Sequence, residues 1–164
     1  MGEINEDDLK KLAYEIDELG GNPLSKLEGI LKLLPSNIYI KDREGRYLFA
    51  TQYWHHLNMD SKDGHWSIAG KTDLEIRKDK ENALLAMESD RRVIESDKGT
   101  SYVINIKLDN KQEYFKVIKE PIHDDDGNVV GIVGLIYDVT EEENIRISLE
   151  KESLFDSLTT SGFL

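Results

Sequence analysis

The residues of this chain that could do chemistry are bulky aromatic and cationic side chains suited to a pocket for a small molecule. Trp54 and Trp66, with several tyrosines, could line a cavity between a sheet and helices, although plain core packing is the alternative. Lys116 and Lys119 alternate onto opposite faces of one strand, and whichever lies on the concave face would suit a carboxylate ligand. The candidate ligand-binding residues are Trp54, Trp66, Ile104, Tyr114, Lys116 and Tyr137.

The sequence carries no signature of a catalytic site. It has no P-loop, no G-x-S-x-G or H-E-x-x-H motif, and no cysteine nucleophile. The lack of cysteine also excludes disulfides, thiolate metal ligands, covalent cysteinyl-flavin chemistry and c-type haem attachment. Residues 124–126 are all acidic but lack the spacing of a calcium loop. We therefore assign no metal site and expect this chain not to be an enzyme by itself.

Composition narrows the class of protein and its partners. The 164 residues suffice for one domain with appendages, and 38% apolar with 33% charged residues is typical of a globular chain. The net charge of −12 disfavours nucleic acid and anionic membrane surfaces as partners. No run approaches the ~20 apolar residues of a membrane span, and the acidic N-terminus is unlike a signal peptide. We expect a cytoplasmic location.

Two amphipathic helices are predicted in an N-terminal extension, residues 1–34. The first begins at the capping Asn5 and carries apolar residues at three- and four-residue spacing up to Leu19. The second spans residues 22–34, with Pro23 at its first position. Stripes this narrow either pair with a helix of a second copy of the chain or pack against the chain's own sheet.

Residues 35–140 form the predicted domain. Strands are expected at residues 38–40 and 46–50, joined by a turn in which Gly45 supplies a positive φ. Short helices follow the caps Thr51 and Thr72, and a longer helix spans residues 78–96. Three strands follow at residues 101–108, 112–122 and 128–139. This order predicts an α+β fold, a five-stranded antiparallel sheet with helices on one face.

Within the longer helix, we expect one buried and one solvated side. Leu84, Leu85 and Val93 belong to the expected buried side, with Met87 and Ile94. Asp90 belongs to the expected solvated side, together with the two arginines that follow it.

Several segments in this order resemble a PAS sensor domain with its C-terminal PAC motif. They are IYIKDREGRY at residues 38–47, IAGKTD at 68–73, DRRVIES at 90–96, KEPI at 119–122, and the last hairpin with its DVTE junction at 124–141. The resemblance covers about residues 33–142 and implies the PAS sheet. The family commonly has Asn where this chain has the cap Thr51, so a ligand role for that amide is not carried over.

The resemblance also bears on cofactors. In the family's haem sensors the iron ligand comes from the long helix, and residues 78–96 contain no histidine. His55 and His56 lie instead on the short helix after the second strand, where at most one can face inward. Haem and covalent flavin are therefore disfavoured, non-covalent flavin stays open, and the cofactor is left unknown.

The C-terminal segment, residues 141–164, resembles a signalling helix followed by the start of a truncated output domain. The run LEKESLFDSLT at residues 149–159 is similar to the linker and opening of a GGDEF diguanylate cyclase domain, and the match ends at Thr159. A histidine kinase has a comparable acidic linker helix and is the alternative output.

Residues at the start of that helix are the predicted signal relay, namely Asp138 and Thr140. Thr140 can cap the helix, and the three glutamates after it favour its N-terminus. The apolar residues of the helix would be buried by pairing with a second copy, so a homodimer is expected. The resemblance thus implies a bacterial PAS sensor that binds a small molecule and relays its state to an output domain. The alternative is a ligand-free PAS dimerisation module.

Overall fold

The computed structural model describes residues 6–21, 26, 29, 33, 36–50, 68–108 and 110–161. The chain divides into two compact units, Met1–Pro35 and Ser36–Leu164. The first unit contains α1 (Glu6–Glu18), which confirms the first predicted helix. Apart from single positions, the second predicted helix lies outside the described residues, as does the short helix expected after Thr51.

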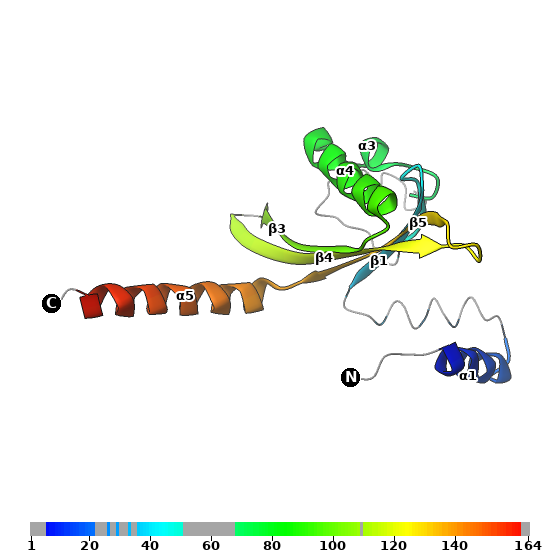
Figure 1. Ribbon diagram of the computed structural model, residues 1–164, viewed down its shortest axis with the longest axis horizontal. Helices are drawn as coiled ribbons and strands as arrows, with labels where there is room; N and C mark the ends of the chain where they lie inside the picture. The colour runs from blue at the N-terminus through cyan, green and yellow to red at the C-terminus, as the bar shows by residue number, and fades with distance from the viewer. Residues whose placement is uncertain are drawn as a thin grey trace. The chain divides into compact units, whose positions relative to one another are not determined.

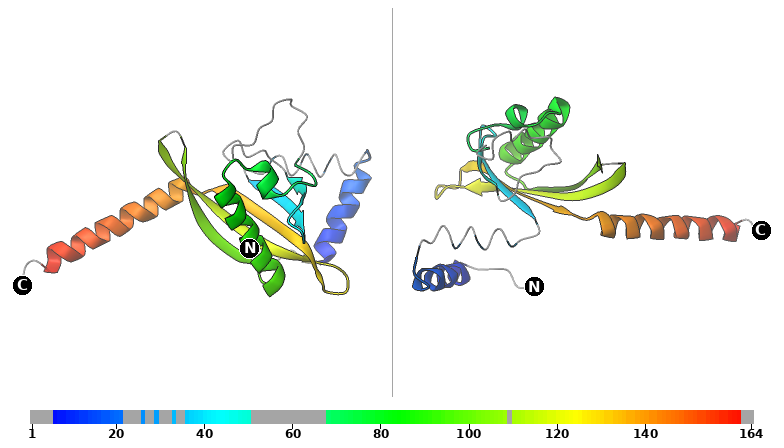
Figure 2. Two further views of the ribbon diagram at one scale, coloured as in Figure 1. Left: turned by 90° about the horizontal axis from the view of Figure 1, so that it is seen from above. Right: turned by 180° about the vertical axis from the view of Figure 1, so that it is seen from behind.

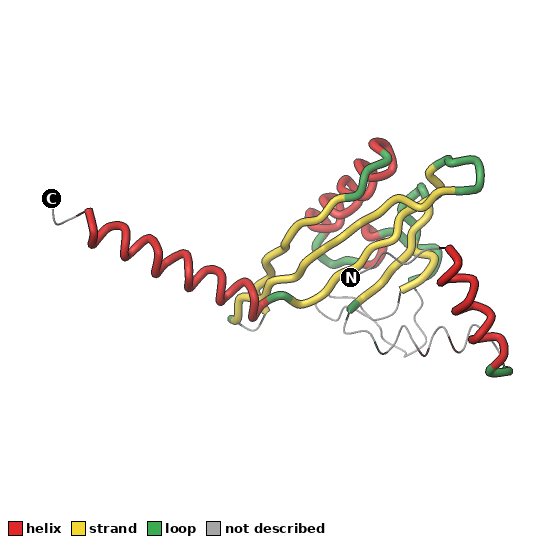
Figure 3. The backbone as a smooth tube through the Cα atoms, turned by 60° about the horizontal axis from the view of Figure 1, so that its bottom comes forward, coloured by secondary structure: helices red, strands yellow, loops and turns green. Residues whose placement is uncertain are grey.

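The second unit is built on one antiparallel sheet of five strands. They are β1 (Asn37–Asp42), β2 (Tyr47–Ala50), β3 (Thr100–Leu108), β4 (Lys111–His123) and β5 (Val129–Asp138), in the spatial order β2-β1-β5-β4-β3. Figure 3 shows the strands as a single curved layer. Two helices, α3 (Asp73–Ile76) and α4 (Lys80–Ser96), cover one face of that layer (Figure 1). The predicted α+β fold is confirmed.

Local side-chain chemistry explains where these elements begin and end. In the β1–β2 turn the Asp42 carboxylate accepts hydrogen bonds from the main-chain N–H groups of Glu44 and Arg46, and Gly45 has φ +78°. The Glu75 carboxylate accepts the Thr72 N–H at 2.7 Å, which starts α3. Asp79 caps α4 by accepting the Asn82 N–H at 2.9 Å.

The hydrophobic core lies between the helices and the inner face of the sheet. Because side chains alternate along a strand, every second residue of β1, β4 and β5 points toward α4. Val93 of α4 and Ile76 of α3 close the core from the other side. The buried members are Tyr39, Tyr47, Ile76, Val93, Phe115, Val117, Ile132 and Ile136.

The predicted sides of α4 are partly wrong. Leu84 and Leu85 are 55% and 66% exposed, whereas Asp90 is only 2% exposed. The buried side instead contains Ala83, which is 0% exposed, together with Asp90 seven residues later and Val93 three residues after that. These spacings place all three on one side of the helix. Asp90 can be buried because its charge is paired with lysines of the sheet, described below.

The last strand passes almost directly into a long helix. β5 ends at Asp138, and after Val139 alone α5 (Thr140–Ser161) begins. Figures 1 and 2 show α5 leaving the end of β5 as one straight rod. Its first turn lies beside β4, and most of its apolar side chains are exposed, including Ile145 at 54% and Leu158 at 63%.

Candidate functional site

A cavity of about 580 Å³ lies between α4 and the inner face of the sheet. This volume falls within the range typical of small-molecule sites. Four strands and the helix supply its wall, with Tyr39, Tyr102, Ile104, Val117, Lys119 and Ile136 from the sheet and Ala86, Ser89 and Val93 from α4. Apolar side chains and the buried Lys119 thus form much of the wall, and polar and charged residues, including Arg77, Glu88 and Arg92, complete it.

Asp90 joins α4 to two strands through a pair of buried lysines. Its Oδ2 accepts a hydrogen bond from Lys41 Nζ of β1 at 2.6 Å, and its Oδ1 accepts one from Lys119 Nζ of β4 at 2.5 Å. The two lysines are 1% and 2% exposed. Lys119 also donates to the Ala86 carbonyl at 3.2 Å. These bonds fix where the helix crosses the sheet, and thereby the size of the cavity.

Asp73, at the start of α3, is a second buried carboxylate in the same network. It accepts hydrogen bonds from Lys41 Nζ, from the Tyr47 hydroxyl at 3.0 Å and from Arg77 Nε at 2.7 Å. Burial alone would raise the pKa of Asp73, but Lys41 and Arg77 outweigh it and hold that pKa below its usual value. The carboxylate is therefore ionised at neutral pH.

Lys41, which pairs with both carboxylates, is correspondingly charged. Burial alone would lower the pKa of Lys41, but the neighbouring Tyr47 and the two carboxylates outweigh it and hold that pKa above its usual value. Burial also raises the pKa of the Tyr39 and Tyr47 hydroxyls. Within the described residues, no buried side-chain polar atom lacks a hydrogen-bond partner. Each of these buried polar atoms thus has at least one partner, which favours a rigid arrangement at this end of the core.

The polar part of the cavity wall gathers around Lys119. Its Nζ lies 5.9 Å from the centre of the Tyr102 ring, and the Tyr102 hydroxyl is 3.3 Å from the hydroxyl of Ser89. Arg77, paired with Asp73, also lines the cavity. These groups are hydrogen-bond donors in an apolar surround, an arrangement that can orient a small ligand carrying acceptor oxygens.

The structure places the predicted ligand-binding residues in three locations. Ile104 lines the cavity. Tyr114, Lys116 and Tyr137 are not among the lining residues, because they alternate with inward-pointing residues and lie on the other face of the sheet. Trp54 and Trp66 are outside the described residues.

Lys119, which was weighed together with Lys116 but left out of the candidate list, is the lysine that reaches the cavity. Its alternation with the buried Phe115 and Val117 was the signal that could have identified it. Asp90 had no comparable local signal, because an acid in a charged helix is ordinarily solvated.

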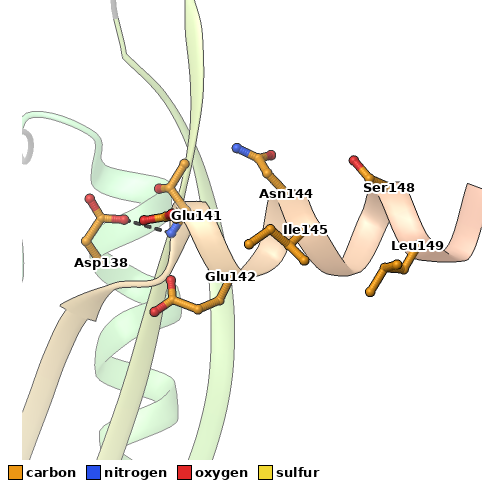
Figure 4. Close-up of a pocket in the computed structure, with 8 residues that line it drawn as sticks. Asp138, Glu141, Glu142, Asn144, Ile145, Ser148 and Leu149 are labelled. Atoms are coloured by element: carbon orange, nitrogen blue, oxygen red, sulfur yellow. Dashed lines mark hydrogen bonds between the residues drawn. The ribbon is translucent and has the colours of Figure 1, made fainter.

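Both predicted relay residues lie at the junction of β5 and α5. The Asp138 carboxylate accepts the Thr140 N–H at 2.8 Å, as drawn in Figure 4. Thr140 Oγ1 accepts the N–H of Tyr114 in β4 at 3.0 Å, and the Val139 N–H donates to the Tyr114 carbonyl at 2.9 Å. The start of α5 is therefore attached to the main chain of β4 and to the side chain of the last residue of β5.

A second, larger hollow of about 780 Å³ lies at this junction (Figure 4). It is formed mainly by exposed side chains along one side of α5, such as Ile145 and Leu149, together with Asp138. Because a single helix and a strand end make up its wall, it is a surface hollow and not an enclosed site.

Two other kinds of functional feature are absent from the described residues. No group of three or more histidines or acids there is arranged to hold a metal ion. No helix among these residues is both long enough and apolar enough to cross a membrane.

Comparison with known proteins agrees with this geometry. A diguanylate cyclase of Vibrio cholerae serotype O1 is 28% identical over 148 residues, which cover 88% of this chain and 45% of the relative. The chain thus spans less than half the length of this curated relative.

Among solved structures, a ligand and DNA complex of Vibrio cholerae VqmA has TM-score 0.57 and 25% identity, covering 71% of this chain and 51% of that one. The PAS domain of Bordetella pertussis BvgS has TM-score 0.56 and 21% identity, covering 81% and 98%. The sequence profile described as PAS fold matches residues 31–144. With the sheet, the helices on its inner face and this match, the chain belongs to the PAS family.

Proposed function

We propose that this chain is the sensory part of a signalling protein, binding a small molecule in the cavity under α4 and relaying occupancy through α5. The observation that carries the proposal is the short path between the cavity and the helix. Ile136 lines the cavity and lies two residues before Asp138, where β5 ends. Any ligand that displaces Ile136 acts on the strand that leads into α5.

A second path runs along β4. Val117 lines the cavity, and three residues earlier Tyr114 holds Val139 and Thr140 through its main chain. A shift of β4 therefore changes the hydrogen bonds that hold the first turn of α5. Since both strands of the path are hydrogen-bonded neighbours, they move together and re-aim the helix.

The proposed output is a diguanylate cyclase domain. This output is supported by the similarity of the chain to part of a diguanylate cyclase. The VqmA structure is a complex with a ligand as well as DNA, and its ligand supports small-molecule binding here. We do not propose DNA as a partner of this chain, because a net charge of −12 repels a phosphate backbone.

The apolar residues of α5 support a dimer of this chain. At about 100° per residue, Ile147, Leu154 and Leu158 fall on one side of the helix, and Ile145 and Leu149 fall on nearly the opposite side. Leu154 and Leu158 are 62% and 63% exposed. Their spacing with Ile147 matches a coiled-coil seam, in which a second copy would bury them.

Charge substitutions on α5 test this pairing. Leu154→Glu with Leu158→Glu should lower self-association, because two carboxylates would face their copies across the seam. Leu149→Glu is the matched control, being similarly exposed at 60% but on the other side. Sedimentation velocity over a concentration series measures the effect. Equal association of all three proteins would contradict pairing through this seam.

Native mass spectrometry of gently purified protein tests the sensing proposal. A stoichiometric small molecule, lost when the cavity is filled by Ser89→Phe, is the expected result. Leu84→Phe is the control, because Leu84 is exposed on the same helix and does not line the cavity. A dimer that carries no molecule and binds none from a metabolite extract would favour the alternative, a ligand-free dimerisation module.

A further inference from the structure

The charges buried around the cavity do not balance within the described part of the chain. Lys41, Lys119 and Arg77 contribute three positive charges, and Asp73 and Asp90 contribute two negative ones. The lysine and aspartate side chains are at most 3% exposed, and the Arg77 side chain is 11% exposed. One unit of positive charge therefore remains in a region where an unmatched charge is costly.

Two of these three cations line the cavity. Lys119 and Arg77 both belong to its wall, whereas the two carboxylates that neutralise them do not. The excess positive charge is consequently presented to the cavity, and the carboxylates lie behind it. This is opposite in sign to the chain as a whole, which carries a net charge of −12.

Lys119 also has bonding capacity left for a ligand. An ammonium group has three N–H donors, and the acceptors within the described residues are Asp90 Oδ1 and the Ala86 carbonyl. The hydroxyls of Tyr102 and Ser89, which contact each other, lie on the same wall. Together these groups can donate to both oxygens of one carboxylate.

The rest of the wall indicates what such a carboxylate would be attached to. Val93, Val117 and Ile136 are 1%, 3% and 8% exposed and give the cavity an apolar floor. Arg92 and Lys98 are exposed lining residues, and Arg92 pairs at 3.0 Å with Glu88, the one acid among the described lining residues. Cations around an entrance attract anions, even into an acidic protein.

We propose that the cavity takes a small amphipathic monocarboxylate, with its carboxylate on Lys119 and its apolar body on the floor of Val93, Val117 and Ile136. This inference rests on the proposed sensing function and adds the chemical class of the ligand. The ligand carboxylate shares Lys119 with Asp90, and the pairing of α4 with β4 consequently weakens when the site is occupied. Occupancy is in this way converted into a loosening of the helix that covers the sheet.

Matched acids and amides test the charge requirement with the full chain. The probes are phenylacetate against phenylacetamide, and indole-3-acetate against indole-3-acetamide, each titrated by isothermal calorimetry. The members of a pair have nearly the same shape, so any preference reports the charge. A carboxylate should bind about tenfold more tightly than its amide, because hydrogen bonds to an ionised group are the stronger ones.

Variants assign the preference to one lysine. Lys119→Met should bring the acid and the amide to nearly equal affinity, while Lys116→Met, on the other face of the sheet, should keep the difference. Lys119→Met leaves Asp90 with only one of its two lysine partners. The double variant Lys119→Met with Asp90→Asn removes both charges, and it too should bind the acid and the amide with nearly equal affinity. Circular dichroism confirms that each variant is folded.

Three results would overturn the inference. They are amides that bind as well as acids in the unmodified chain, an acid preference that survives in Lys119→Met, and an absence of binding by every carboxylate. If a neutral molecule is then found by native mass spectrometry, the sensing proposal stands and only the anionic class fails. If the cavity also proves empty in that experiment, the sensing proposal fails as well.

Discussion

Asp90→Asn should destabilise the fold strongly, although it changes only one side-chain atom. Asp90 is 2% exposed and is the carboxylate that pairs with both Lys41 and Lys119. The substitution raises the net charge of the buried cluster by one unit. Lys41 keeps Asp73 as a charged partner, but Lys119 loses its only carboxylate among the described residues and keeps neutral acceptors, the Ala86 carbonyl and the amide oxygen that the substitution leaves.

The expected cost follows from the geometry. Removing one partner of a buried ion pair costs about 3–5 kcal/mol, and we expect about 3 kcal/mol because Lys41 retains Asp73. Since domains of this size are stable by about 5–15 kcal/mol, the variant should remain folded. Its melting temperature should fall by roughly 10 °C.

Urea denaturation followed by far-ultraviolet circular dichroism measures this cost. The dependence on urea should be unchanged, because the surface exposed on unfolding is the same. Glu95→Gln is the matched control on α4. Its side chain is 60% exposed and pairs with Arg91, so about 0–1 kcal/mol is expected.

A double-mutant cycle separates pairing from simple loss of packing. Asp90→Asn with Lys119→Met should cost about 2 kcal/mol less than the sum of the two single changes, because neither charge is left buried alone. A cost below about 1 kcal/mol for Asp90→Asn, or strict additivity of the pair, would refute the account of Asp90 as the residue that joins α4 to the sheet.

Three other substitutions or conditions give measurable outcomes. Gly134→Ala should cost about 1–3 kcal/mol in urea denaturation, because a Cβ there would overlap the buried Tyr39 ring; a neutral result would mean the ring moves freely. The free energy of unfolding should fall as pH rises above about 10. The pKa values of Tyr39, Tyr47 and Lys41 are raised in the folded state, so the folded chain keeps protons that the unfolded chain loses. Urea midpoints measured across alkaline pH check this, and midpoints that do not change with pH would contradict it. Thr140→Val should speed hydrogen exchange at the first turn of α5 by about fivefold, as one hydrogen bond worth about 1 kcal/mol is lost; unchanged rates would separate that hydroxyl from the relay.

The strands and most helix ends were predictable because their causes are local. Alternating apolar residues give β4 and β5, Gly45 meets the positive φ of its turn, and Thr72 with Glu75 marks the start of α3. The exit of β5 into a helix at Thr140 was predicted in the same way. Each of these signals lies within a few residues of the structure it specifies.

The charged network was not predictable on the same basis. Asp90 pairs with Lys41 across 49 residues and with Lys119 across 29, so no local window contains both partners. Without those lysines, Leu84 and Leu85 look like the better core residues of α4. The burial of the helix was therefore decided by charges on the sheet and not by its own apolar pattern.

The predicted ligand-binding residues come from both faces of the sheet. Aromatic character favoured Tyr114 and Tyr137, but both faces of this sheet carry bulky side chains, and only the position of α4 tells which face encloses a cavity. Their part in ligand binding, with that of Lys116, stays a prediction. Lys119 was separable only through its alternation with Phe115 and Val117.

The central claim is that a change in the cavity is felt at the start of α5. Backbone amide NMR of Ser89→Phe tests it most directly, since Ser89 lines the cavity from α4, away from the junction. We predict shifted amide resonances for Tyr114, Val139 and Thr140, and unshifted ones in Leu84→Phe. Resonances that change around the cavity in Ser89→Phe but stay at their original positions at these three amides would contradict the claim.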